Sequence, residues 1–172
     1  MPMADRRAEQ GDEVPCPIGL AAPVIGDRWA LLIMRNAMGG MTRFQEFRDA
    51  LGIADNVLST RMSRLVEAGL LVRTPYRDGG RTRQEYRLTT AGADLLPVLN
   101  ALVAWSNKHI EGVNRDDPMK VLHSVCGQPL GPGEFCPACE RRAERDEIRW
   151  LRPWASREPF PVAEPVASPA AS

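Results

Sequence analysis

The chain has 172 residues, and its 22 basic and 22 acidic side chains give a formal net charge of zero. This length suits one domain with at most a small appendage, and a hydrophobic content of 44% is enough to bury a core. Neutrality excludes a histone-like protein that coats nucleic acid by bulk charge, but it allows a local basic face. No secretory h-region and no run of ~18 apolar residues is present. The sequence therefore predicts a cytoplasmic protein without a membrane partner.

Composition divides the chain into four segments. Residues 1–13 are polar and charged, so a disordered N-terminus is expected, whereas residues 14–112 carry nearly all of the periodic apolar signal. Residues 118–142 combine Gly/Pro-rich turns with three of the four cysteines. Residues 143–172 begin as a charge run and end rich in proline and alanine, which predicts a disordered tail.

In residues 14–112, capping and turn residues separate the periodic apolar stretches into predicted elements. A short apolar segment over 17–25 is followed by three helices over 28–38, 43–51 and 56–68. Two strands over 70–76 and 83–88 and a long last helix over 90–110 complete the series. Asp27 and Thr42 occupy N-cap positions. The pair Asp78-Gly79 is a strong hairpin signal between the strands. Pro97 is expected to kink the last helix. The order of helix, helix, turn, helix and hairpin is that of a winged helix-turn-helix domain.

The third helix is amphipathic. At 100° per residue, Leu58, Met62 and Leu65 share one face, and short polar side chains gather on the opposite face. Short polar groups let a helix approach base edges in the major groove, and asparagine can pair with adenine in a bidentate way. An ordinary amphipathic surface helix is the alternative. The candidate DNA-contacting residues of this recognition helix are Asn56, Ser59, Thr60, Arg61, Ser63 and Arg64.

Local charge favours DNA binding. Residues 41–90 hold nine arginines against six acids, which leaves about +3 in a neutral chain. Five of the nine lie on the hairpin, where they could follow the DNA backbone. A solvated, charged hairpin is the alternative. The candidate wing residues are Arg77, Arg81, Thr82 and Arg83.

An ordered series of fragments runs from about Cys16 to Glu111: Cys-Pro-Ile at 16–18, IGDRWALLI at 25–33, RFQEF at 43–47, LSTRM at 58–62, LVEAGLLVR at 65–73 and EYRLT at 85–89. This series resembles the HxlR-type bacterial regulators, a branch of the MarR-like winged-helix proteins. The resemblance implies a homodimeric transcription regulator, dimerised through the first and last helices of the domain. The chain departs from the family at the wing tip, where Gly-Gly-Arg-Thr replaces a frequent proline.

The apolar content of the last helix supports a dimer independently. The helix offers more apolar surface than one small winged domain needs, on Leu95, Leu96, Val98, Leu99, Leu102, Val103 and Trp105. The alternative is that the helix only closes its own core. A two-fold dimer would match a pseudo-palindromic operator with half-sites about one turn apart. The predicted function is a sequence-specific repressor of this kind, responsive to a redox or small-molecule signal.

Three cysteines and a histidine have the spacing of a metal site: His123-x2-Cys126-x9-Cys136-x2-Cys139. Two short-spaced pairs on Gly/Pro-rich turns are typical of tetrahedral structural zinc. Three thiolates and one imidazole leave no open position, so the zinc would be structural and would supply folding free energy. A redox Cys-x-x-Cys is the alternative. The predicted fold class is thus mainly α with a small β-hairpin wing, followed by a small zinc-knuckle-like segment.

Cys16 stands apart from this group. In regulators of the HxlR type, some cysteines at this position sense oxidants or electrophiles, which requires an exposed and reactive thiolate. The alternative is a small buried residue in the dimer seam.

Two other classes of function compete with a DNA-binding regulator. A thiol oxidoreductase would use Cys136 and Cys139, but the sequence lacks a thioredoxin-like pattern, a G-x-S-x-G, a G-x-G-x-x-G and a P-loop. We therefore do not expect an enzyme. A protein-interaction module would use Trp150, Leu151 and Trp154 of the tail to anchor a partner.

Overall fold

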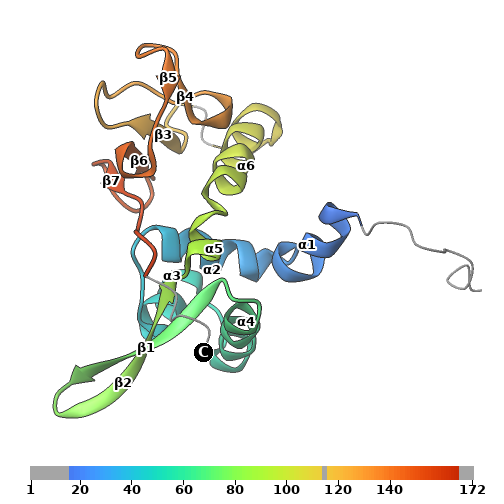
Figure 1. The fold of residues 1–172 in the computed structure, drawn as a ribbon, viewed down its shortest axis with the longest axis vertical. Coiled ribbons are helices and arrows are strands. Elements are labelled where there is room, and N and C mark those ends of the chain that lie inside the picture. Colours follow the sequence, from blue (N-terminus) through green and yellow to red (C-terminus); the bar gives the residue numbers. More distant parts are fainter. Residues whose placement is uncertain (1–15, 114–115, 167–172) are drawn as a thin grey trace, which may run out of the picture.

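The structure, a computed structural model, describes residues 16–113 and 116–166, so the predicted disordered segment 1–13 lies outside it. Its two lobes lie at opposite ends of the molecule, with α6 rising from one into the other (Figure 1). The first lobe holds α1 (Pro17–Ile25), α2 (Arg28–Met38), α3 (Phe44–Leu51), α4 (Asp55–Glu67), β1 (Leu71–Asp78), β2 (Arg81–Leu88) and α5 (Thr90–Ala93). The second follows α6 (Leu96–His109) with β3 (Lys120–His123), η1 (Pro132–Glu134), β4 (Phe135–Cys136), β5 (Arg141–Arg142), η2 (Arg145–Glu147), β6 (Ile148–Leu151) and β7 (Phe160–Pro161).

The core of the first lobe confirms the predicted inward face of the helix expected over 56–68, which is α4 in the structure. Leu58 and Met62 of α4 are fully buried and Leu65 is 2% exposed, against Ile33 and Phe47 in the same core cluster. α2, which carries Ile33, begins where the sequence predicts, because the Asp27 carboxylate accepts the N–H groups of residues 29 and 30. The resulting α2–α4 packing fixes which face of α4 points outward.

The hairpin is longer and tighter than predicted. β1 and β2 pair from Leu71 opposite Leu88 to Asp78 opposite Arg81, so only Gly79 and Gly80 form the turn. Their φ angles are +55° and +81°, a combination that two-residue hairpin turns need and that glycine adopts without strain. The six-residue loop expected over 77–82 is therefore mostly strand, which carries its arginines to the tip.

The predicted single helix over 90–110 is wrong, because the chain breaks between α5 and α6. Thr89 caps α5, its hydroxyl accepting the Gly92 N–H at 3.0 Å. A Cβ at Gly92 would lie 2.0 Å from the Leu70 carbonyl oxygen, so only glycine allows this approach. Pro97 falls in the first turn of α6, where a missing N–H costs no intrahelical bond. Pro97 therefore starts a helix instead of kinking one.

The expected disordered tail is corrected for residues 143–166. β6 pairs with both β3 and β7 in an antiparallel sheet, and Trp150 is fully buried with its Nε1 donating to Asn100 Oδ1 at 2.9 Å. Further along, Ala163 N donates to Met38 O at 2.7 Å, and residue 166 bonds to the end of β2. Composition alone did not indicate this packing, because a charge run followed by a proline-rich end is typical of a disordered tail. Residues 167–172 lie outside the described part.

Membrane-spanning length is not reached by any single helix of the described residues. The bent pair of α1 and α2, which meet at 80°, passes the length and composition test only when taken together.

Candidate functional site

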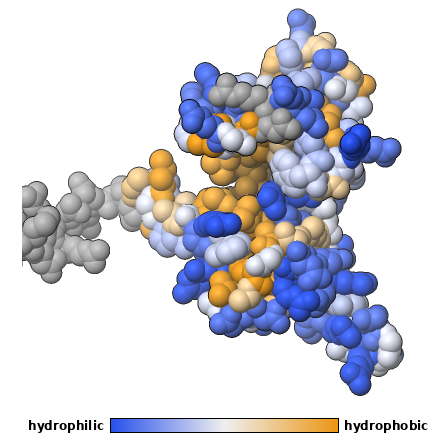
Figure 2. All heavy atoms as spheres, turned by 180° about the vertical axis from the view of Figure 1, so that it is seen from behind, coloured by the Kyte–Doolittle hydropathy of each residue, from blue (hydrophilic) through white to orange (hydrophobic). Residues whose placement is uncertain are grey.

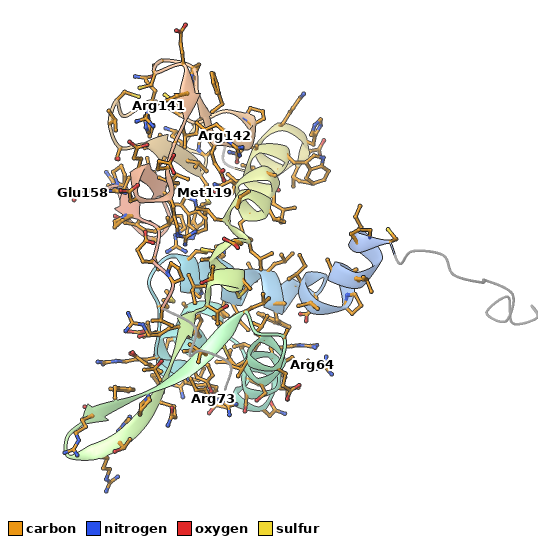
Figure 3. The ribbon with its side chains drawn as sticks, in the orientation of Figure 1. Arg64, Arg73, Met119, Arg141, Arg142 and Glu158 are labelled. Carbon is orange, nitrogen blue, oxygen red and sulfur yellow. The ribbon has the colours of Figure 1, made fainter. Side chains whose placement is uncertain are left out.

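The outward face of α4 presents most of the predicted recognition residues. Asn56, Ser59, Thr60 and Arg64 are exposed, and Arg64 projects from the helix in Figure 3. The Asn56 carbonyl oxygen accepts the Thr60 hydroxyl at 2.9 Å, and its side-chain oxygen accepts the Val57 N–H. Because these bonds use only oxygens of Asn56, its amide nitrogen is left to donate outward. An acceptor on a base edge could meet that nitrogen.

All four predicted wing residues are exposed on the hairpin, which projects from the first lobe (Figure 1). Arg83 Nε lies 3.3 Å from an Asp78 carboxylate oxygen across the strands. Arg77 and Arg81 form no ion pair with the residues that the structure describes, so their guanidinium groups are open to phosphate oxygens. Thr82 follows Arg81 on β2 and faces Arg77 of β1. The hairpin thus offers cations at its tip.

Arg61 and Ser63 are not free on the recognition face. Arg61 is half-buried, and its Nη1 lies 3.4 Å from the Asp27 carboxylate at the start of α2. The Ser63 hydroxyl accepts a hydrogen bond from Arg73 of β1 at 3.0 Å. Both side chains therefore hold α4 against its neighbours. Helix periodicity places them near the polar face but carries no information about these partners.

Two arginines that were not predicted as site residues belong to this surface, Arg73 on β1 and Arg43 next to the hairpin. The Arg43 guanidinium is 5.0 Å from the Tyr76 ring centroid, and the Arg73 guanidinium is 5.8 Å from the Tyr86 ring. Figure 3 shows Arg73 between the hairpin and α4. For Arg73 the sequence signal is a tyrosine, Tyr86, at the facing position of the next strand. Arg43 lies at the N-cap of α3 and has no such signal.

The four predicted metal ligands come together in the second lobe. The ligand atoms of His123, Cys126, Cys136 and Cys139 all lie within 4.8 Å of one another. The Cys126 and Cys136 sulfurs are 3.5 Å apart, and His123 Nδ1 is 3.4 Å from the Cys126 sulfur. Thiolates at about 2.3 Å from a tetrahedral zinc ion would be about 3.8 Å from each other. This group of side chains could therefore hold a metal ion.

The carboxylate of Glu147 orients the His123 ring. Its Oε2 lies 3.4 Å from His123 Nε2, on the side of the ring away from the sulfurs. Two charge-assisted bonds from Arg141, 2.6 and 2.8 Å long, grip the same carboxylate, and this guanidinium lowers the pKa of Glu147 to about 2. A charged carboxylate at Nε2 favours a proton there and leaves Nδ1 as the ligand atom.

The metal-ligand cluster is distant from the hairpin. Arg141 and Arg142, which neighbour the cluster, lie at the end of the molecule opposite the wing (Figure 3). The cluster is therefore not part of the surface formed by α4 and the hairpin.

Cys16 and the expected dimer elements are exposed. Cys16 occupies the N-cap of α1, a helix with no buried residue in the single chain. Ile18 is 80% exposed, and Trp105 of α6 is 55% exposed. Apolar side chains this open on two helices leave a large area uncovered.

Comparison with known proteins shows which class of protein has this arrangement. The family model of HxlR-like helix-turn-helix proteins matches residues 24–114, more than half of the chain. The chain belongs to the HxlR-like helix-turn-helix family. The HTH-type transcriptional regulator Rv3095 of Mycobacterium tuberculosis is 39% identical over 125 residues, or 71% of this chain and 76% of the relative.

Solved structures place the HxlR-like domain in context. PA1607 superposes with a TM-score of 0.62 at 34% identity, covering 77% of this chain and 91% of PA1607. The redox regulator HypR in its reduced form has a TM-score of 0.51 at 26% identity, covering 56% of this chain and 95% of HypR. The likeness to PA1607 therefore reaches beyond the winged domain. The relatives are transcription regulators and not enzymes, as the sequence predicted.

Proposed function

We propose that this HxlR-like regulator is a sequence-specific repressor that binds double-stranded DNA as a homodimer in the cytoplasm. The observation that carries the proposal is the burial of Leu58, Met62 and Leu65 beneath α4. Their burial leaves the polar face of α4 open beside a hairpin tipped with arginine. A helix of this kind fits a major groove, while the hairpin follows the neighbouring backbone.

Each element of the surface has its own role in the proposal. Base edges are read by Asn56, Ser59 and Thr60, with Arg64 at the rim of the groove. Phosphates are bound by the wing residues Arg77, Arg81, Thr82 and Arg83. Arg61 and Ser63 hold α4 in position through Asp27 and Arg73.

The homodimer in the proposal is formed by α1 and α6. The open apolar side chains on these helices, Ile18 and Trp105 among them, would be covered by a second copy. A two-fold axis would bring two α4 helices to successive major grooves of a pseudo-palindromic operator, about 34 Å apart. The distance between the two α4 helices of the dimer would then set the spacing of the operator half-sites.

For the second lobe we propose one structural zinc ion held by His123, Cys126, Cys136 and Cys139. The donor set favours zinc, since three thiolates and an imidazole close a tetrahedral shell. The strands around the cluster are only two to four residues long. Bound zinc would supply folding free energy that so small a core lacks.

The effector in the proposal is a redox signal sensed by the thiol of Cys16. The thiol is exposed at the N-cap of α1, where an oxidant can reach it. HypR, a redox regulator, has a similar winged domain.

A mobility-shift assay on the promoter beside the protein's own gene tests the proposed function. We expect a retarded complex whose affinity falls steeply with salt, because each neutralised phosphate releases counterions. A probe with one half-site deleted should bind much more weakly than the full operator. Absence of binding, or binding that is insensitive to salt, would contradict the proposal. Unchanged affinity for the half-site would contradict the dimer alone.

A further inference from the structure

The waist between the two lobes contains a hollow of about 530 Å³. Its walls come from α2, α6, β6 and residues 112–113 and 117–119 of the connection after α6, including Leu31, Leu102 and Trp150. Figure 2 shows apolar surface gathered where the two lobes meet. Sites for small molecules have volumes of about 300–1,000 Å³ and mostly apolar walls. The hollow thus has the size and the lining of a ligand site.

The wall on the α6 side is fixed in place. Asn107 of α6 donates to the Met119 carbonyl oxygen at 2.8 Å, which ties the connection to the helix. Met119 is itself 7% exposed and belongs to the core cluster. Trp150 on the far side is held by its bond to Asn100. Walls held in this way form a site before any ligand arrives.

Arg35 brings a positive charge to this apolar lining. Its Nε and Nη2 both donate to Asn36 Oδ1, at 3.1 and 2.9 Å, and its Nη1 donates to none of the described residues. Burial lowers the pKa of Arg35, and no carboxylate among those residues offsets the effect. The neutral amide oxygen solvates the guanidinium but does not balance its charge.

A second guanidinium adds positive charge beside Arg35, whereas the one acidic residue among the described residues lining the hollow is Asp117. Arg152 is 5% exposed, and its Nη1 donates to the same Asn36 oxygen at 3.3 Å. Within the described part of the chain, Arg152 Nε and Asn36 Nδ2 are buried without a hydrogen-bond partner. Two like charges therefore share one neutral acceptor. A nearby anion would relieve their repulsion.

We propose that the waist hollow binds a small organic anion, with an apolar ring packed against Leu31, Leu102 and Trp150 and a carboxylate at Arg35 Nη1. A second copy of α1 is the competing occupant, because it is apolar and fully open. That helix, with the sequence PIGLAAPVI, carries no acidic side chain and would bury Arg35 without a counter-ion. Charge complementarity therefore favours the small anion.

Binding to the purified full-length chain tests the site without DNA, so its failure is distinct from failure of the proposed repressor. The probes are 2-naphthoate and its uncharged analogue 2-naphthamide, measured by calorimetry and by quenching of tryptophan fluorescence. We expect one naphthoate per chain and at least tenfold weaker binding of the amide. Equal affinities for the two probes, or no naphthoate binding at about 1 mM, would overturn the site.

Variants locate the bound carboxylate. Arg35→Gln should weaken naphthoate binding at least tenfold with no effect on 2-naphthamide, and Arg35→Lys should retain part of the affinity. Arg157→Gln, which removes an exposed arginine outside the hollow, is the matched control and should bind normally. Circular dichroism checks that each variant is folded. Normal naphthoate binding by Arg35→Gln would overturn the assignment.

The competing occupant is tested with Ile18→Asp, which places a charge on the open face of α1. Naphthoate binding should be the same in this variant and at every protein concentration. Binding that appears only in Ile18→Asp would assign the hollow to a second copy of the chain and overturn the proposal.

Discussion

Arg73 of β1 donates from Nη2 to the Ser63 hydroxyl of α4 over 3.0 Å, which joins the wing to the helix beside it. The same guanidinium lies 5.8 Å from the Tyr86 ring of the paired strand. Both strands and α4 are therefore linked at one point. In the proposed complex this contact sets the angle between the groove-reading helix and the backbone-following hairpin.

Replacing Arg73 by methionine tests that link. Methionine keeps an apolar stem but removes the donors, so we expect operator affinity to fall about 3- to 10-fold, the loss of one modest hydrogen bond. The melting temperature should hardly change, because the contact is exposed. Fluorescence anisotropy with labelled operator measures the affinity. Arg157→Met is the control, since Arg157 is an exposed arginine of the second lobe. Equal affinities for both variants would contradict a linking role.

Removing Asn56 or Thr60 should change which bases are preferred. Asn56→Ala and Thr60→Ala are each expected to relax discrimination at one base position by ~1–3 kcal/mol. Competition with operators that carry single base changes measures this effect. Glu67→Gln, at the exposed end of α4, should keep the wild-type preference. A uniform loss of affinity at all positions would show that these side chains do not read bases.

Arg81→Ala should weaken binding to every sequence alike. Loss of one phosphate contact flattens the slope of log affinity against log salt by about one unit. Asp78→Asn is the opposite test, because it removes a negative charge beside Arg83 and should strengthen binding. Salt titrations of both variants on operator and on unrelated DNA provide the measurement. If Arg81→Ala altered only sequence preference, the wing would not be bound to phosphates.

The parts of this fold that sequence predicted are those set by local signals. Leu58, Met62 and Leu65 repeat with helical spacing, and Gly79 sits where a tight turn needs a positive φ. The metal-ligand cluster was also predicted from a local signal, the spacing of His123 and the three cysteines. Each signal is contained within about twenty residues of chain.

Contacts between residues that are far apart in the chain could not be predicted from the sequence. Arg61 pairs with Asp27 across 34 positions, and Trp150 bonds to Asn100 across 50. A charge run and a proline-rich end have the composition of a disordered tail. What orders residues 143–166 is a surface supplied by α2 and α6, which composition does not contain.

Metal analysis tests the cluster in the second lobe. We expect one zinc per chain by mass spectrometry, lost in Cys139→Ser and kept in Cys16→Ser, which removes the separate thiol. Glu147→Gln should keep the ligands but lower zinc affinity about 10- to 100-fold, because it weakens the orientation of His123. Competition with a chromophoric chelator measures that affinity. Full zinc occupancy in Cys139→Ser would contradict the ligand set.

Asn100 should be essential for the packing of the second lobe. Its side chain accepts from Trp150 Nε1 at 2.9 Å and donates to Glu134 Oε1 at 3.0 Å. Asn100→Leu leaves the buried Trp150 Nε1 without an acceptor and removes one donor to Glu134. We therefore expect unfolding free energy to fall by about 1–3 kcal/mol and tryptophan emission to shift to longer wavelength. Urea titration measures the first effect. Trp154→Phe, which alters an exposed side chain, should leave stability near wild type. A neutral Asn100→Leu would mean that β6 is not held against α6 in solution.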